Sequence, residues 1–195
     1  MHILAKKLTQ WLLKTGAIEE KEKELYEYAV FSFLFSLFPL CLVMIIGGIS
    51  GMFIEGVLMI LPFMIIRKFS GGYHLNSSVV CFIFSTLLLS LCLALIKLIN
   101  SSGTYGLLLC VAAVNALQIF AYSPIDSEKR KLSQKEQAVF RKIARIMVGA
   151  FLTFSLLLYL LGTKEFSVPI GMGIIITALL QLPCVFTREQ KNAME

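Results

Sequence analysis

A polar segment at residues 67–78 interrupts the apolar sequence and contains residue types that could carry out acyl transfer. His74 lies in this segment, and Cys81 follows seven residues later. A thiol must lose its proton before it can attack a carbonyl, and imidazole is the usual base because it titrates near neutrality. The two residues therefore suggest a dyad in which His74 activates Cys81. The alternative is a plain connecting loop, because a histidine and a cysteine at this spacing often occur by chance.

The spacing of the two residues excludes a single straight helix through both. Seven helical residues rise by about 10.5 Å, which is too far for a hydrogen bond between imidazole nitrogen and sulfur. Gly71 and Gly72 could let the loop fold back towards Cys81. Cys81 would then lie near the start of the next helix, where unpaired amides favour a thiolate.

The elements that must position this pair are membrane helices. The chain has 195 residues, of which 57% are hydrophobic and only 15% are charged, and its mean hydropathy is +0.81. The apolar residues fall in runs of about 17 to 21, roughly the length that crosses a bilayer as a helix. The runs lack the alternation of a membrane β-barrel, so we predict an all-α, polytopic transmembrane bundle of about six spans. The predicted spans are residues 29–46, 49–66, 79–98, 104–122, 146–162 and 167–186.

The distribution of positive charge predicts the orientation. With six spans, 16 of the 18 Lys and Arg residues lie on the side of the two termini, and only Lys97 and Lys164 lie on the other. Short cytoplasmic loops carry the excess of Lys and Arg, so we expect a multi-pass membrane protein with both termini in the cytoplasm. The net charge of +6 is explained by this topology and by anionic lipid, without a nucleic acid. We expect one membrane-embedded domain, 1–195, made of cytoplasmic interfacial helices (1–28), the bundle (29–186) and a cytoplasmic tail (187–195).

Local patterns predict several helix ends. Residues 3–13 form an apolar helical stripe flanked by lysines, typical of an interfacial helix that either anchors the chain or docks a partner. Glu19 and Lys23 have the spacing of a helical ion pair. Gly47, Gly48 and Gly51 predict a tight turn between the first two spans. A capping box of Ser133 and Glu136 predicts a helix that starts near Gln134.

The cysteines give no sign of a disulfide framework or of a metal site. All five lie inside or at the ends of apolar runs, without a CxxC spacing: Cys41, Cys81, Cys92, Cys110 and Cys184. A small apolar packing role accounts for at least four of them. We therefore expect no metal and no cofactor.

Two motifs together resemble a known family. Arg67, Gly71-Gly72, His74 and Cys81, at these spacings between the second and third spans, resemble the accessory gene regulator B family of bacterial membrane cysteine endopeptidases. The segment Ala121-Tyr122-Ser123-Pro124-Ile125-Asp126 is similar to the Ala-Pro-Val-Asp loop that follows span four in this family. Tyr122 and Ser123 intervene, so the match is to its Pro-aliphatic-Asp core. The similar hydrophobic layout extends over nearly the whole chain.

The resemblance implies roles for individual residues. Cys81 corresponds to the nucleophile and His74 to the general base. Arg67 and Gly72 match positions on which activity depends. Arg67 could clamp a carboxylate or carbonyl of the substrate, or anchor the chain at the inner leaflet.

The remaining assignments stay open. Gly71 and Gly72 could be turn residues, and the amide of Gly72 could also donate to an oxyanion. Asp126 could orient His74 or cap the turn at Pro124.

The function implied by the resemblance is cleavage of a quorum-sensing propeptide at the cytoplasmic face. Cleavage near its C-terminal side leaves the N-terminal part on Cys81 as a thioester, which then cyclises to a thiolactone or lactone. The expected partners are an AgrD-like propeptide, membrane lipid and a second copy of the chain in a homodimer. One alternative is a transporter or exporter of the peptide, although Glu55 and Lys97 lie only near span ends. The other is a non-catalytic membrane subunit, in which Cys81 would only pack.

Overall fold

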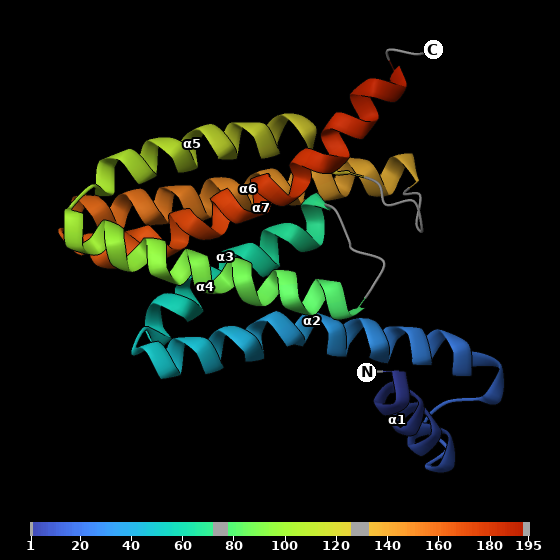
Figure 1. The fold of residues 1–195 in the computed structure, drawn as a ribbon. Helices are drawn as coiled ribbons and strands as arrows, with labels where there is room; N and C mark the ends of the chain where they lie inside the picture. The colour runs from blue at the N-terminus through green and yellow to red at the C-terminus, as the bar shows by residue number, and fades with distance from the viewer. Residues whose placement is uncertain (1, 72–77, 126–132, 193–195) are drawn as a thin grey trace.

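The computed structural model describes residues 2–71, 78–125 and 133–192, and every regular element in these ranges is helical (Figure 1). The predicted all-α class is therefore confirmed. The first part of the chain contains α1 (His2–Lys14), a short 3₁₀ helix (Glu20–Glu22) and α2 (Lys23–Ser50). The bundle continues with α3 (Phe53–Ser70), α4 (Ser78–Ser102), α5 (Tyr105–Tyr122), α6 (Gln134–Leu160) and α7 (Lys164–Asn192).

Not every long helix of the chain is apolar along a length that would cross a membrane. Among the described residues, four helical stretches are long and apolar enough to cross a membrane: Phe82–Ser102, Tyr105–Tyr122, Gln134–Leu160 and Lys164–Val185. A shorter apolar stretch, Leu37–Ser50, lies in α2. The 18 residues of α3 include the charged Glu55, Arg67 and Lys68. The chain is thus a multi-pass helical membrane protein, and the count of six spans stays a prediction.

The centre of the bundle is α7. In the most apolar 18 consecutive residues of its stretch Lys164–Val185, 67% of the residues are buried, whereas the corresponding parts of the other three stretches are between 17% and 28% buried. It packs against α3, α5 and α6, as Figure 1 shows. The approach to α3 is close, because a Cβ on Gly173 would lie 2.5 Å from the Met59 carbonyl oxygen and 2.7 Å from Pro62 Cγ. Small residues allow such close packing between membrane helices.

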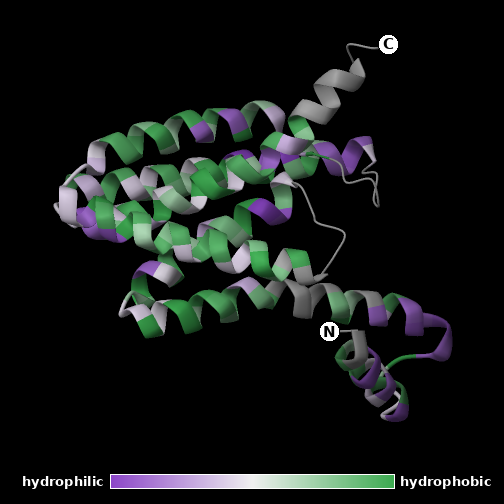
Figure 2. Ribbon diagram, viewed as in Figure 1, coloured by the Kyte–Doolittle hydropathy of each residue, from purple (hydrophilic) through white to green (hydrophobic). Residues whose placement is uncertain are grey.

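The N-terminal helix α1 packs against α2 and stands apart from the bundle (Figure 1). Ala5 and Thr9 are buried in this contact, whereas Leu4, Leu8 and Trp11 are exposed. Figure 2 shows that hydrophilic residues gather at the corner between α1 and α2 and at the start of α6. The predicted helix is present, and its location at a membrane interface stays a prediction.

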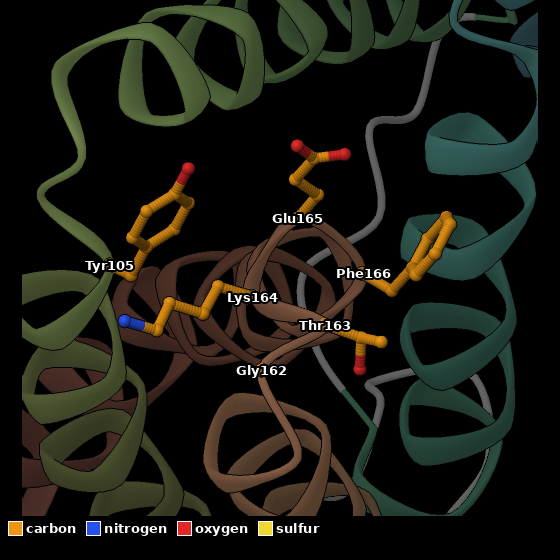
Figure 3. A pocket seen from close by; sticks show the side chains of 6 residues that line it. All are labelled: Tyr105, Gly162, Thr163, Lys164, Glu165 and Phe166. Carbon is orange, nitrogen blue, oxygen red and sulfur yellow. The ribbon is translucent and has the colours of Figure 1, made fainter.

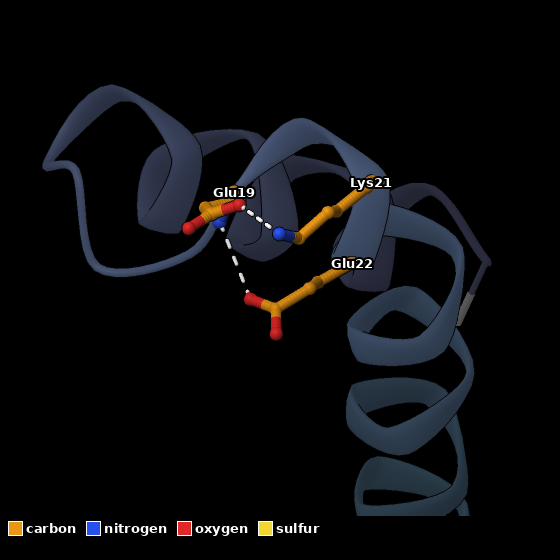
Figure 4. A network of polar contacts seen from close by, with 3 residues as sticks. All are labelled: Glu19, Lys21 and Glu22. Carbon is orange, nitrogen blue, oxygen red and sulfur yellow. Dashed lines mark hydrogen bonds and ion pairs between the residues drawn. The ribbon is translucent and has the colours of Figure 1, made fainter.

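The expected Glu19–Lys23 pairing is wrong. Glu19 forms its ion pair with Lys21 at 2.6 Å, and its amide donates to Glu22 Oε2 at 3.3 Å (Figure 4). The reason is that Glu19 has an extended backbone and precedes the 3₁₀ helix, so the α-helical spacing does not apply. Both side chains of the ion pair are exposed, and it contributes little stability.

Two predicted helix ends can be compared directly. Gly51, with φ of +70°, ends α2, whereas Gly47 and Gly48 lie inside the helix, so the turn is shorter than the three glycines suggested. At the start of α6, the Glu136 amide donates to Ser133 Oγ at 3.3 Å and the Ser133 amide donates to Glu136 Oε2 at 2.9 Å. The predicted capping box and the start at Gln134 are confirmed.

Candidate active site at the end of α3

The end of α3 is held by two other parts of the chain. The last carbonyls of a helix have no partner within the helix and must be satisfied from outside. The Ser70 carbonyl accepts a hydrogen bond from the Ile125 amide at 2.9 Å and a second from Gln181 Nε2 at 3.1 Å. Ser70 and Gln181 are fully buried. The segment after α5 and the central helix α7 therefore both cap α3.

Gly71 makes this close contact possible. It follows α3 with φ of +75° and ψ of −167°, and its amide donates to the Arg67 carbonyl at 3.1 Å. A Cβ at this position would overlap the Ile125 carbonyl oxygen and would lie 3.2 Å from the Ile125 carbonyl carbon. Both the backbone conformation and the space therefore require glycine.

The segment after α5 is buried against the end of α3. The Ser123 amide continues the helical hydrogen bonding by donating to the Ile119 carbonyl at 3.0 Å. A cis peptide bond joins Ser123 to Pro124, and residues 123–125 are all buried. Gln181 Nε2 donates to Ser123 Oγ at 3.1 Å. The two segments that the sequence marked separately thus lie together, joined by one backbone hydrogen bond and one glutamine.

The first half of α6 supports the same end of the bundle. Arg145 donates two hydrogen bonds to the Phe120 carbonyl, from Nε at 3.2 Å and from Nη2 at 3.1 Å. A guanidinium near the last carbonyls of a helix also interacts favourably with its dipole. The rings of Phe69 and Phe140 meet edge to face at 5.8 Å. These contacts tie α6 to the ends of α3 and α5.

The predicted site residues fall partly within this region. Arg67 lies in the last turn of α3, half-buried, with its guanidinium carbon 5.7 Å from the centre of the Phe63 ring. The backbone of Cys81 lies in the first turn of α4, which begins at Ser78.

His74, Gly72 and Asp126 lie outside the described residues. The described ranges adjoin them, because Gly71 comes directly before Gly72 and Ile125 directly before Asp126. The geometry of the His74–Cys81 dyad stays a prediction.

The other four cysteines occupy ordinary helical positions. Cys92 is buried in α4, Cys41 and Cys110 are exposed, and Cys184 is half-buried. Within the described part of the chain, no three His, Cys, Asp or Glu residues are grouped so that they could hold a metal ion.

A shallow pocket of about 330 Å³ lies at the other end of the bundle. It is formed by Tyr105 at the start of α5 and by residues 162–166 at the turn between α6 and α7 (Figure 3). Lys164 Nζ lies 5.3 Å from the centre of the Tyr159 ring. Because α5 runs from Tyr105 to Tyr122, this pocket is separated from Ser123 by the full length of a helix. It does not belong to the candidate site.

Sequence reasoning assigned no role to Ser70 or Ser123, although both lie in the marked segments, and it did not identify Gln181. Of the three, Gln181 gave the clearest signal in the sequence, since a side-chain amide inside an apolar span needs a hydrogen-bond partner. Nothing in the sequence identified that partner as the end of α3.

Comparisons with known proteins agree with the layout of the chain. The family model of Accessory gene regulator B matches residues 5–183. The chain is similar to Putative AgrB-like protein 1 of Clostridium perfringens, with 24% identity over 193 residues, covering 98% of this chain and 99% of that relative. It is also similar to Putative AgrB-like protein 2 of the same organism, with 22% identity over 169 residues, covering 80% of this chain and 78% of the relative. No solved structure matches the chain.

Proposed function

The chain belongs to the accessory gene regulator B family, whose membership implies a role in processing a quorum-sensing peptide, and we propose that it does so as a cysteine endopeptidase. Cys81 is the nucleophile and His74 the general base. The observation that carries the proposal is the hydrogen bond from the Ile125 amide to the Ser70 carbonyl. This bond joins the end of α3, which leads into the predicted catalytic segment, to Ile125, which directly precedes Asp126.

The chemistry follows from a thiol, an imidazole and a peptide carbonyl. His74 takes the proton from the Cys81 thiol, and the thiolate attacks the scissile carbonyl carbon of the propeptide. The tetrahedral intermediate collapses with loss of the amine, which receives the proton from His74. The N-terminal part of the propeptide stays on Cys81 as a thioester, and the C-terminal fragment leaves.

Cyclisation is a second acyl transfer. A cysteine thiol or serine hydroxyl of the bound peptide gives its proton to His74 and attacks the thioester carbonyl. The bond to Cys81 then breaks, and the enzyme thiol is restored by the proton from His74. Transfer from thiol to thiol is nearly isoenergetic, so water must be excluded from the thioester until the ring closes.

The supporting residues are assigned from their positions relative to the two segments. Arg67 binds a carboxylate or carbonyl of the propeptide at the end of α3. Gly71 lets the chain pass Ile125 closely enough to form the Ser70 hydrogen bond. Gly72 is the next residue and offers an amide to the developing oxyanion. Asp126 caps the turn at Pro124.

The positive charge supports a cytoplasmic location for this end of the bundle, since Arg67, Lys68 and residues 129–145 contain nine of the 18 Lys and Arg residues. Reporter domains fused after Ser70 and after Ser133 should report cytoplasm, and one fused after Ser101 should report the outside. A cytoplasmic signal at Ser101 contradicts the proposed topology.

The nucleophile is tested by Cys81→Ala in membranes that also contain the propeptide. Cys92→Ala is the matched control, because Cys92 lies in the same helix and is buried in packing. We expect Cys81→Ala to abolish cleavage at normal membrane levels and Cys92→Ala to retain it. Equal cleavage by the two variants would reject the proposal.

The thioester is tested separately by mass spectrometry of the purified protein. A peptide whose internal nucleophile is replaced by alanine cannot close a ring, so the acyl group should accumulate on Cys81 in a form that hydroxylamine removes. Linear hydrolysed peptide without such an adduct would indicate a protease that does not cyclise.

A further inference from the structure

Gln181 occupies an unusual place for an amide. It lies in the central helix α7, four residues before Val185, where the apolar stretch of this helix ends. The side chain is fully buried and donates to two groups from different parts of the chain, the Ser70 carbonyl and Ser123 Oγ, both at 3.1 Å. A buried amide is costly unless it is hydrogen-bonded, so these two bonds fix where Gln181 can lie.

The chemistry of the acceptors determines the orientation of the amide. The Ser70 carbonyl can only accept, so the NH₂ group of Gln181 and not its oxygen must face it. The same nitrogen uses its second proton for Ser123 Oγ. Gln181 Oε1 is buried without a hydrogen-bond partner among the described residues. The Gln181 side chain therefore holds the Ser70 carbonyl and Ser123 Oγ together through its nitrogen, while its own oxygen accepts no hydrogen bond from the described residues.

The two acceptors adjoin the two segments of the proposed active site. Ser70 is two residues before Gly72, and Ser123 is three residues before Asp126. The Ile125 amide bonds the same Ser70 carbonyl at 2.9 Å. The carbonyl thus receives one donor from the segment after α5 and one from α7, and the three elements meet at a single oxygen.

We propose that Gln181 is a positioning residue that links the end of α3 to the segment after α5 and thereby fixes the points at which the chain enters the proposed catalytic segment, after Gly71, and reaches Asp126, after Ile125. The inference rests on the proposed cysteine endopeptidase function. Gln181 does not touch the reacting atoms in this account, and it acts through Ser70 and Ser123. Small displacements of a catalytic group are enough to slow a reaction severely, so a two-point link at this place has a direct effect on rate.

A second glutamine provides the matched control. Gln118 in α5 donates from Nε2 to the Ala178 carbonyl of α7 at 3.0 Å, which is the same donor atom at nearly the same distance and also involves α7. Its recorded hydrogen bond is to Ala178, and not to Ser70, Ser123 or Ile125. Gln118 shares the chemistry of Gln181 but not its location.

The experiment compares Gln181→Met with Gln118→Met, because methionine keeps the length of glutamine and loses both amide donors. We expect Gln181→Met to lower kcat for propeptide cleavage by about 100-fold with KM little changed. Gln118→Met should keep kcat within about threefold, since the end of α3 is intact. Hydrogen exchange is measured in parallel on the peptide that contains Ile125, and it should be faster in Gln181→Met alone.

A second variant guards against a failure of Gln181→Met to fold. Ser123→Ala removes one of the two acceptors and should lower kcat by about 10-fold. The double variant should be no slower than Gln181→Met, because the lost interaction is the same one. Additive losses in the double variant, or a Ser123→Ala variant with full activity, would overturn the link.

The two proposals fail in different ways. Equal kcat and equal exchange at Ile125 in Gln181→Met and Gln118→Met would overturn the role of Gln181, while loss of activity in Cys81→Ala would still support the endopeptidase. Full activity of Cys81→Ala would instead reject the endopeptidase, whatever the exchange at Ile125 shows.

Discussion

Substitution of Gly71 by alanine tests the close approach of α3 to the segment after α5. With φ of +75° and ψ of −167°, Gly71 has a backbone conformation that costs a residue with a Cβ about 1–3 kcal/mol. The new Cβ would also overlap the Ile125 carbonyl oxygen. Relief of that overlap would break the bond between the Ile125 amide and the Ser70 carbonyl, and a buried amide left without a partner costs about 1–3 kcal/mol.

The backbone strain and the lost hydrogen bond together destabilise the packing of the end of α3 against Ile125 by about 3 kcal/mol. The fraction of molecules with this packing then falls about 100-fold. Propeptide cleavage in reconstituted vesicles should fall by a similar factor, because only the native arrangement presents the catalytic segment correctly. Steady-state kinetics give this factor, and thermal unfolding of the protein in detergent gives the change in stability.

The matched control is Gly103→Ala. Gly103 also follows a helix, with φ of +71° and its amide bonded to the Ile99 carbonyl at 3.0 Å, but a Cβ there would meet nothing within 4 Å. Its cost is the backbone conformation alone, about 1 kcal/mol, with little effect on cleavage. If Gly71→Ala and Gly103→Ala reduce cleavage equally, the contact with Ile125 is not what constrains position 71.

Three further predictions concern the packing that supports the site. Gly173→Ala should lower the unfolding midpoint markedly, with a cost of about 1–3 kcal/mol, because the new methyl would overlap the backbone of α3. The control Gly48→Ala should leave the midpoint unchanged, because its methyl would meet nothing within 4 Å. Equal midpoints for the two variants would contradict the close contact between α3 and α7. Arg145→Met should cost about 1 kcal/mol of stability, since it removes both donors to the Phe120 carbonyl, and an unchanged midpoint would show that these bonds contribute nothing. Ser155→Ala removes a buried donor 2.9 Å from the Ser167 carbonyl, so it should lower the midpoint without changing kcat, and a loss of kcat alone would contradict the location of the site at the other end of α7.

Some parts of the fold follow directly from the sequence. The lengths of the apolar runs predicted long helices, because only a helix satisfies every backbone group within one segment in lipid. The start of α6 could be placed to the residue, since a serine and a glutamate three positions apart satisfy each other's amides without help from the rest of the chain. The error at Glu19 has the opposite origin, because an i, i+4 pair exists only where the backbone is already helical.

The centre of the bundle could not be predicted in this way. In a soluble helix the buried face is apolar and the exposed face is polar, but lipid is as apolar as the interior of a membrane protein. Val168 and Ile174 in α7 are fully buried, whereas Leu107 and Leu117 in α5 are 69% exposed. The residue types do not distinguish the two environments. The close glycine contact at Gly173 marks the central helix, and its meaning depends on the neighbour that approaches it.

The hydrogen bonds at the candidate site could not be predicted from residue types either. The residue types of Gly71 and of the Pro-aliphatic-Asp segment are unusual for an apolar chain and so marked both segments. The one link expected between them was Asp126 orienting His74, and both residues lie outside the described part of the chain. The two segments are linked by hydrogen bonds among the Ser70 carbonyl, the Ile125 amide and the side chain of Gln181. The first two are backbone groups, which carry no signal in the residue types. Gln181 alone could have indicated a buried acceptor, since its amide must be satisfied somewhere. Which acceptor it reaches depends on the close packing of α3 and α7, and so the end of α3, directly before the proposed catalytic segment, is held by a helix that contains none of the predicted catalytic residues.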